Sequence, residues 1–316
     1  MSASAPPPVR VRVPATSANL GPAFDCAGLA LSVYDQLEFS VAAGGLVVTM
    51  SGEGAESLPA DESHLVVRAF RAACAELGWT PPGLRVVTQN GIPQGRGMGS
   101  SAAAVVAGVM GAWALCPDVE AIDLDAVLRL GTELEGHPDN VAACLLGGAT
   151  LSWMGDGGAR ADRLAVSDEV LPVVLVPDTT LSTHVARSLL PELVPHADAA
   201  FNAGRSALLV HALTAEPGLL LEATEDRLHQ GQRGAAMPGS RDLVERLRAA
   251  GHAAVVSGAG PSLLVLTRRH PEDREPDTAV RVREIRELVP DAWRLLPLEV
   301  DRQGASVLAG PQVSSR

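Results

Sequence analysis

The alternation of apolar and polar residues predicts a set of short strands. Some stretches alternate with a period of two residues, and others are short apolar runs beside turn residues such as the Gly44-Gly45 pair. In the first half of the chain, strands are predicted at residues 9–13, 37–41, 46–50, 84–88 and 148–154. In the second half, they are predicted at residues 170–176, 253–256 and 263–267.

Helical periodicity and its start and stop residues predict the helices. Residues 65–77 form a helix that stops at Gly78, and Asp123 caps a helix that ends at Gly136. Residues 100–115 are rich in Ala and Val, so this helix is expected to be buried. Further helices are predicted at residues 183–190, 198–213, 219–228 and 240–250. Strands and helices mix without a regular strand–helix–strand period, so the expected fold class is α+β rather than doubly wound α/β.

The length of 316 residues suits two domains or one large one. The glycine-rich loop at residues 155–160 is the expected boundary between a first domain at 9–155 and a second at 160–316. Residues 1–8 are expected to form a disordered tail, and residues 268–277 a charged surface loop.

Charge and cysteine content narrow the class of protein. The net charge is −12, with no evident basic face, which argues against a nucleic-acid partner. The four cysteines are scattered without a C-x-x-C motif, which predicts reduced thiols and a cytoplasmic protein. The first residues, MSASAPPPVR, lack the apolar core of a signal peptide, and no apolar run is long enough to cross a membrane.

The sequence contains no lysine, so all 25 basic residues are arginine. This excludes a Walker A loop, which requires lysine before its Ser or Thr. It also excludes the lysine-dependent protein-kinase mechanism and Schiff-base chemistry on lysine. Anions must therefore be bound by backbone N–H groups, by arginine or by a metal ion.

The stretch GRGMGSSAAA at residues 95–104 is a candidate anion site of this kind. Gly95, Gly97 and Gly99 allow the backbone to turn its N–H groups toward a ligand. Ser100 and Ser101 then open a helix whose first N–H groups lack intrahelical partners and carry partial positive charge. On spacing alone, a phosphate loop and a simple glycine turn before a close-packed helix both remain open.

Five ordered motifs together resemble the GHMP kinase family. The glycine-rich loop, taken from Pro93, resembles the family's phosphate-loop motif. The glycine-rich stretch at residues 257–262 resembles the family's C-terminal glycine motif. Three other stretches resemble the branch of the family that acts on L-homoserine. The motifs are 14–21 (PATSANLG), 93–103 (PQGRGMGSSAA), 136–142 (GHPDNVA), 182–191 (STHVARSLLP) and 257–262 (SGAGPS).

The resemblance implies a two-domain fold, with an N-terminal domain like domain 2 of ribosomal protein S5 and a ferredoxin-like C-terminal domain. It implies transfer of the γ-phosphate of ATP to the hydroxyl of L-homoserine with Mg²⁺, a step toward threonine. A homodimer is an expectation from the family resemblance alone. The alternatives are a kinase for another small alcohol, or a catalytically silent relative that binds ATP or an amino acid.

The resemblance also implies which residues form the site. Arg187 and Arg233 are expected to bind the substrate carboxylate, because guanidinium pairs with carboxylate as a fork. The other residues expected at the substrate are Asn19, Asp25, His137, Asp139, Asn140 and Thr183. The residues expected at ATP are His64, Pro93, Gln94, Gly95, Arg96, Gly97, Met98, Gly99, Ser100, Ser101, Ala102, Gly258 and Gly260.

Two questions about this site stay open at the level of sequence. The Mg²⁺ ligands are expected to be Ser101 and Glu135, with Glu133 as the alternative to Glu135. No general base stands out. Asp139 is one candidate and His137 a weaker one, and transition-state stabilisation without a base is the expectation from the resemblance.

Overall fold

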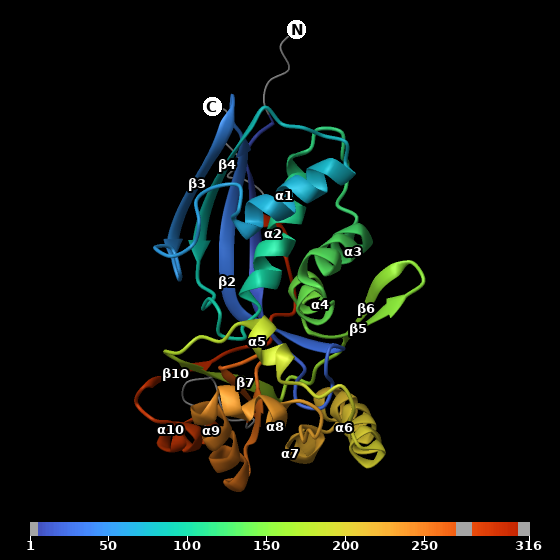
Figure 1. Cartoon of the computed structure of the whole chain (residues 1–316), viewed down its shortest axis with the longest axis vertical. Coiled ribbons are helices and arrows are strands. Elements are labelled where there is room, and N and C mark those ends of the chain that lie inside the picture. Colours follow the sequence, from blue (N-terminus) through green and yellow to red (C-terminus); the bar gives the residue numbers. More distant parts are fainter. Residues whose placement is uncertain (1–5, 270–279, 309–316) are drawn as a thin grey trace.

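The computed structural model describes residues 6–269 and 280–308 of the chain. Two sheets organise it, a larger one in the upper half of Figure 1 and a smaller one below. The larger sheet has the strand order β11-β1-β2-β4-β3, and β5 and β6 extend it from β2. Its strands are β1 (Val9–Ala18), β2 (Ala27–Val41), β3 (Gly45–Gly52), β4 (Gly83–Asn90), β5 (Ala149–Gly155), β6 (Gly158–Leu164) and β11 (Ser306–Leu308).

The strands on either side of the Gly44-Gly45 turn both form, but they do not pair with each other. β4 lies between them, antiparallel to β2 and parallel to β3. The backbones of Gly83 and Gly44 lie very close together, since a Cβ on Gly83 would lie 2.5 Å from the carbonyl carbon of Gly44. This close backbone approach, rather than a hairpin, sets the order of the strands.

Four helices cover one face of the larger sheet, as Figure 1 shows: α1 (Leu65–Glu76), α2 (Ser100–Leu115), α3 (Leu124–Glu135) and α4 (Asp139–Leu146). α2 is buried as expected, because it packs on β1 and is enclosed by the other three helices. A Cβ on Gly108 would lie 2.4 Å from the carbonyl oxygen of Val66, and one on Gly111 would lie 2.6 Å from the ring of Phe39. These glycines let α1 and β2 approach the helix closely.

The smaller sheet is antiparallel, with the order β10-β7-β9-β8. Every residue of β7 is buried, because Leu171 and Val173 pack in a second core while Val170 and Val174 join the main core. The strands are β7 (Val170–Pro177), β8 (Ala253–Val256), β9 (Leu263–Arg268) and β10 (Trp293–Pro297). The accompanying helices are α5 (Thr183–Ser188), α6 (His196–Thr214), α7 (Leu220–Ala223), α8 (Gln230–Arg233), α9 (Pro238–Ala249) and α10 (Val280–Leu288), with 3₁₀ turns at Pro217–Leu219 and Gly234–Ala236.

Several sequence expectations need correction. The helix expected at residues 219–228 is limited to α7, because Asp226 instead accepts hydrogen bonds from the N–H groups of Leu228, His229 and Gln230 and turns the chain. Residues 155–160, the expected domain boundary, contain the turn of the β5–β6 hairpin. The chain therefore leaves the larger sheet only after Leu164, and it returns there as β11.

Other expectations fall outside the described residues. Residues 270–277 of the predicted surface loop and residues 1–5 of the predicted tail are not described. Within the described part of the chain, none of the helices combines the length and the hydropathy that a membrane crossing needs.

Candidate active site

The glycine-rich loop forms the rim of a cavity of about 400 Å³ between the two sheets. Gly95, Gly97 and Gly99 all have left-handed φ angles, of 64°, 70° and 68°. A Cβ on Gly97 would lie 2.2 Å from the carbonyl oxygen of Ser257, and one on Gly99 would lie 1.9 Å from the Thr16 hydroxyl. The backbone conformation therefore favours glycine at all three positions, and the lack of space also requires it at Gly97 and Gly99.

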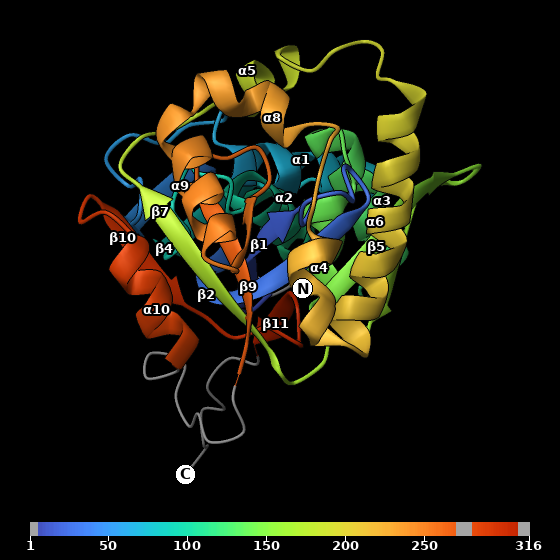
Figure 2. The same ribbon diagram turned by 90° about the horizontal axis from the view of Figure 1, so that it is seen from below.

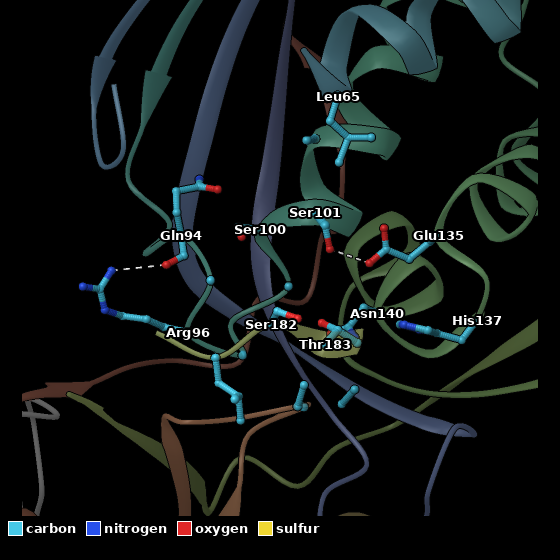
Figure 3. A pocket seen from close by; sticks show the side chains of 18 of the residues that line it. Leu65, Gln94, Arg96, Ser100, Ser101, Glu135, His137, Asn140, Ser182 and Thr183 are labelled. Carbon is cyan, nitrogen blue, oxygen red and sulfur yellow. Dashed lines mark hydrogen bonds between the residues drawn. The ribbon is translucent and has the colours of Figure 1, made fainter. Parts of the chain in front are cut away.

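The loop presents the start of α2 to the cavity. Gly99 is the N-cap residue and supplies no side-chain acceptor for the first N–H groups of the helix. Ser100 and Ser101 line the cavity at this end, as Figure 3 shows. Unpaired N–H groups at the positive end of a sixteen-residue helix form an anion site without lysine.

Arg96 does not direct its charge into this anion site. Its guanidinium donates to the backbone oxygens of Pro177 at 2.9 Å, Gln94 at 3.2 Å and Asp178 at 2.9 Å. Arg96 thus ties the loop to the end of β7. Four residues that we expected at ATP do not line the cavity: Pro93, Met98, Ala102 and Gly260.

The second glycine turn, residues 257–262, closes the cavity from the other sheet. The Ser257 hydroxyl donates to the backbone oxygen of Gly97 at 2.6 Å, and the Gly258 N–H donates to the backbone oxygen of Ala18 at 3.2 Å. Gly258 lines the cavity, whereas a Cβ on Gly260 would lie 2.7 Å from the sulfur of Met237. The turn therefore joins the two halves of the molecule at the glycine-rich loop.

Asn19 and Asp25 are held in strained left-handed conformations, with φ angles of 72° and 57°. The Asn19 amide donates to the backbone oxygen of Gly258 at 3.0 Å and accepts from the N–H of Asp25 at 3.0 Å. Buried Asn19 thereby fixes the turn that carries the Asp25 carboxylate into the cavity.

Asp25 forms a bidentate ion pair with Arg187 of α5, with N–O distances of 2.9 and 2.5 Å. The pair is partly open to solvent, and the hydrogen bonds that Arg187 donates to Asp25 raise the pKa of Arg187. Arg187 also lies over the ring of Phe24, 5.4 Å from its centroid. Two side chains 162 positions apart in the sequence are thus brought together at one end of the cavity.

Arg233 lies beside this pair and is 1% exposed. It lies 5.2 Å from the centre of the Phe24 ring, donates to the Gly258 oxygen at 3.1 Å, and its Nε has no partner in the described structure. Burial, and then the charge of Arg187, lower the pKa of Arg233. A buried guanidinium with a free donor is suited to an incoming carboxylate.

Sequence reasoning missed the residue that holds Arg233. His229 is 1% exposed, donates through Nε2 to the Gly21 oxygen at 2.7 Å, and accepts at Nδ1 from Arg233 at 3.3 Å. Burial lowers the pKa of His229, which favours the neutral ring that this arrangement requires. The only sequence signal was the spacing of four residues between His229 and Arg233 on one helical face.

His137, Asp139 and Asn140 line the cavity at the start of α4. His137 Nδ1 and the Asn140 N–H both bond Oδ1 of Asp139, each at 2.7 Å. Burial lowers the pKa of His137, but the hydrogen bond and charge of Asp139 outweigh it and raise that pKa overall. Asp139 is 2% exposed, so its visible role is to orient its two neighbours.

Ser101 and Glu135 are in direct contact, with the Ser101 hydroxyl donating to Oε1 of Glu135 (Figure 3). Burial raises the pKa of Glu135, and the hydrogen bond from Ser101 opposes this shift. Glu133 is exposed and does not line the cavity. A hydroxyl and a carboxylate beside the phosphate loop are oxygen ligands that fit Mg²⁺, although no cluster of three His, Cys, Asp or Glu side chains occurs in the described residues.

His64 lies at the opposite end of the cavity, where Leu58, Leu65 and Val66 form an apolar lining. His64 Nδ1 caps α1 by accepting from the Val66 N–H at 3.2 Å, while buried Nε2 has no partner in the described structure. Burial lowers the pKa of His64, so the neutral ring offers one Nε2–H donor at the cavity wall.

Thr183 also lines the cavity and is the first residue of α5, after the N-cap Ser182. The Leu181 N–H donates to the backbone oxygen of Gly95 at 3.1 Å, which fixes this segment against the phosphate loop. The cavity thus combines an anion site, a hydroxyl and a carboxylate that suit a cation, two arginines and an apolar slot. This is the set of groups that a small-molecule kinase requires.

Family models agree with this arrangement. The model for the GHMP kinases N terminal domain matches residues 64–148, and the model for GHMP kinases C terminal matches residues 208–288. The chain belongs to the GHMP kinase family, and its α+β fold is the fold of that family. It is an ATP-dependent small-molecule kinase by that membership.

Curated relatives and solved structures define the branch of the family. The chain is 56% identical to the homoserine kinase of Streptomyces coelicolor, over 95% of this chain and 94% of that protein. It is 54% identical to the homoserine kinase of Streptomyces avermitilis, over 95% of each. Among solved structures, the crystal structure of homoserine kinase from Cytophaga hutchinsonii has a TM-score of 0.80 at 25% identity, covering 98% of this chain and 99% of that one.

Proposed function

We propose that the chain is a homoserine kinase, which transfers the γ-phosphate of ATP to the side-chain hydroxyl of L-homoserine. The products are O-phospho-L-homoserine and ADP, and the reaction belongs to threonine biosynthesis in the cytoplasm. The names of four curated relatives, which are 50–56% identical to this chain, support the proposal.

One observation carries the choice of substrate. Arg187, Arg233 and Asp25 converge at the end of the cavity that lies beyond the phosphate loop. An amino acid is a zwitterion, so it needs cationic donors for its carboxylate and an acceptor for its ammonium group. The two guanidinium groups and the Asp25 carboxylate supply both. Mevalonate has a carboxylate but no ammonium group for Asp25, and a neutral sugar has neither.

We infer that catalysis rests on positioning and charge rather than on a strong base. The helix end and loop amides bind the phosphates, and Arg187 with Arg233 fixes the amino acid. Asp139 already accepts from two neighbours through one oxygen, so it orients His137 and Asn140 toward the substrate. Ser101 and Glu135 would hold Mg²⁺, which neutralises phosphate charge during transfer.

The nucleotide base is proposed to lie in the apolar slot beside His64. The unpartnered Nε2–H of His64 would then donate to an acceptor on the base, and Leu65 would pack on its face. Gly95, Gly97 and Gly99 place the phosphates between this slot and the amino-acid end of the cavity.

A coupled ADP-release assay with Mg·ATP tests the proposal against L-homoserine, L-serine, L-threonine, mevalonate and galactose. Turnover on L-homoserine far above the other alcohols is expected. Turnover only on mevalonate or galactose would overturn the substrate assignment while leaving the kinase family intact. Absence of turnover by folded protein that still binds ATP would indicate a silent relative.

A further inference from the structure

The ring of Phe24 lies next to both arginines at the amino-acid end of the cavity. The guanidinium carbon of Arg187 is 5.4 Å from the ring centroid, and that of Arg233 is 5.2 Å from it. Both distances are within the range of an attractive cation–π contact. The helices that carry the arginines, α5 and α8, lie on the same side of the molecule in Figure 2. Phe24 does not line the cavity, so it can affect a substrate only through the arginines.

Arg233 is buried and makes no ion pair in the part of the chain that the structure describes. Its partners are neutral: Nδ1 of His229 at 3.3 Å, the backbone oxygen of Gly258 at 3.1 Å, and the face of the Phe24 ring. Burial of an unpaired charge is costly unless nearby groups stabilise it. Neutral partners stabilise the guanidinium and leave its charge available to a carboxylate from outside.

The two arginines also repel each other, because both carry a positive charge. The charge of Arg187 adds to the effect of burial in lowering the pKa of Arg233. Asp25 is bonded to Arg187 through both of its oxygens. The ring of Phe24 attracts both cations at once, because the face of an aromatic ring is negative. It therefore opposes the separation of the two guanidinium groups.

The turn that carries Phe24 is fixed to the second half of the chain. The backbone oxygen of Gly21 accepts from Nε2 of His229 at 2.7 Å, and the backbone oxygen of Pro22 accepts from the Asn202 amide at 3.2 Å. The His229 ring itself lies 5.0 Å from the Phe24 ring, at an interplanar angle of 39°. These contacts hold the Phe24 ring where the two arginines meet.

We propose that Phe24 is a positioning residue for the amino-acid substrate, which holds the guanidinium groups of Arg187 and Arg233 at one ring without neutralising either. This role rests on the proposed function, because the carboxylate of L-homoserine is the group that the arginines would bind. An Arg233 side chain that leaves the ring is out of place for that carboxylate. The apparent affinity for the amino acid therefore falls with the fraction of molecules that keep Arg233 in place.

Steady-state kinetics with L-homoserine and Mg·ATP test the proposal on variants in which Phe24 is replaced by phenylalanine analogues with increasing ring fluorination, up to pentafluorophenylalanine. Fluorine weakens the negative potential of the ring face and changes the shape of the ring little. KM for L-homoserine should rise stepwise along the series, to about 5–30-fold for the pentafluoro ring. Both kcat and KM for ATP should stay within about twofold, because only binding of the amino acid is affected.

Phe201 provides the matched control. The guanidinium carbons of Arg205 and Arg227 lie 4.6 and 3.8 Å from its ring centroid, and none of these three side chains lines the cavity. The same fluorinated series at Phe201 should leave KM for L-homoserine unchanged. Phe24→Leu, which removes the ring, should match the pentafluoro variant, and melting curves confirm that each protein is folded.

The outcomes separate this proposal from the proposed function. A wild-type protein that does not phosphorylate L-homoserine would overturn the proposed function, and the role of Phe24 with it. An active wild type whose KM stays constant along the Phe24 series would overturn the role of Phe24 alone. An equal rise in KM along the Phe201 series would do so as well, since the effect would then not depend on the two arginines of the cavity.

Discussion

The Asp25–Arg187 ion pair occupies the place proposed for the amino acid, and its replacement gives the sharpest test of how the substrate binds. A zwitterion can split the pair without leaving a charge unpaired, since its carboxylate replaces Asp25 at Arg187 and its ammonium replaces Arg187 at Asp25. An alcohol without the ammonium group would leave Asp25 without a partner. The pair would therefore select for amino acids.

In Asp25→Asn, the ammonium loses a charged acceptor. Such a hydrogen bond contributes about 1.5–3 kcal/mol. Both side chains are about one-third exposed, so we take about 1–2 kcal/mol. This corresponds to a rise of roughly 5–30-fold in KM for L-homoserine, with KM for ATP nearly unchanged. Turnover of 4-hydroxybutyrate, which lacks the ammonium, should hold or improve because Arg187 is freed.

The assay is ADP release with the two alcohols side by side, reported as the ratio of their kcat/KM values. Asp198→Asn is the matched control, because Asp198 pairs with Arg227 at 3.5 Å and neither lines the cavity. The ratio should fall in Asp25→Asn and stay constant in the control. An equal loss of kcat/KM on both substrates would refute the idea that the amino acid replaces the partners of the ion pair. Asp25 would then act only by positioning Arg187.

Three further changes probe other parts of the site and its surroundings. Glu135→Gln should lower kcat/KM by about 10²-fold and raise the Mg²⁺ concentration needed for half-maximal rate, measured by Mg²⁺ titration. Gly97→Ala places a Cβ 2.2 Å from the Ser257 oxygen at a φ of +70° and should cost more than about 2 kcal/mol, measured by thermal melts with and without ATP. Asp35→Asn should stabilise the protein at pH 8 by about 1–3 kcal/mol and change little at pH 4, measured by urea unfolding.

The direction of the Asp35→Asn effect on stability follows from burial, which raises the pKa of the Asp35 carboxyl to about 6. The hydrogen bonds from the N–H groups of Ile92 and Gly91 lower this pKa but do not cancel the effect of burial. Between pH ~4 and 6 the folded state holds this proton more tightly than the unfolded chain, so the free energy of unfolding falls as pH rises. Asparagine keeps an acceptor oxygen without that penalty.

Each of these three changes has an outcome that would count against its reasoning. An unchanged Mg²⁺ requirement in Glu135→Gln would remove that residue from the metal site. A Gly97→Ala protein with normal stability and ATP binding would show that the loop can move away from Ser257. An equal stability difference at pH 4 and pH 8 for Asp35→Asn would show that titration of this carboxyl is not the cause.

The sequence by itself determined those features that depend on local chain chemistry. Three alternating glycines before a long helix rich in small residues indicate a candidate phosphate loop, and the structure places Gly95, Gly97 and Gly99 in left-handed conformations. Caps and stop signals predicted α3, between Asp123 and Gly136, to the residue. The spacing of motifs along the chain, through its resemblance to a known family, indicated the reaction class.

Only the tertiary structure decided which distant groups meet. No local sequence pattern shows that Asp25 pairs with Arg187 or that His229 fixes Arg233. Nor does any local pattern show that the Arg96 guanidinium donates to backbone oxygens and not to a ligand. No local pattern shows that β4 lies between β2 and β3 either, an arrangement in which the backbones of Gly83 and Gly44 approach closely. These outcomes depend on packing between segments far apart in the chain, whereas propensity and capping act over a few residues.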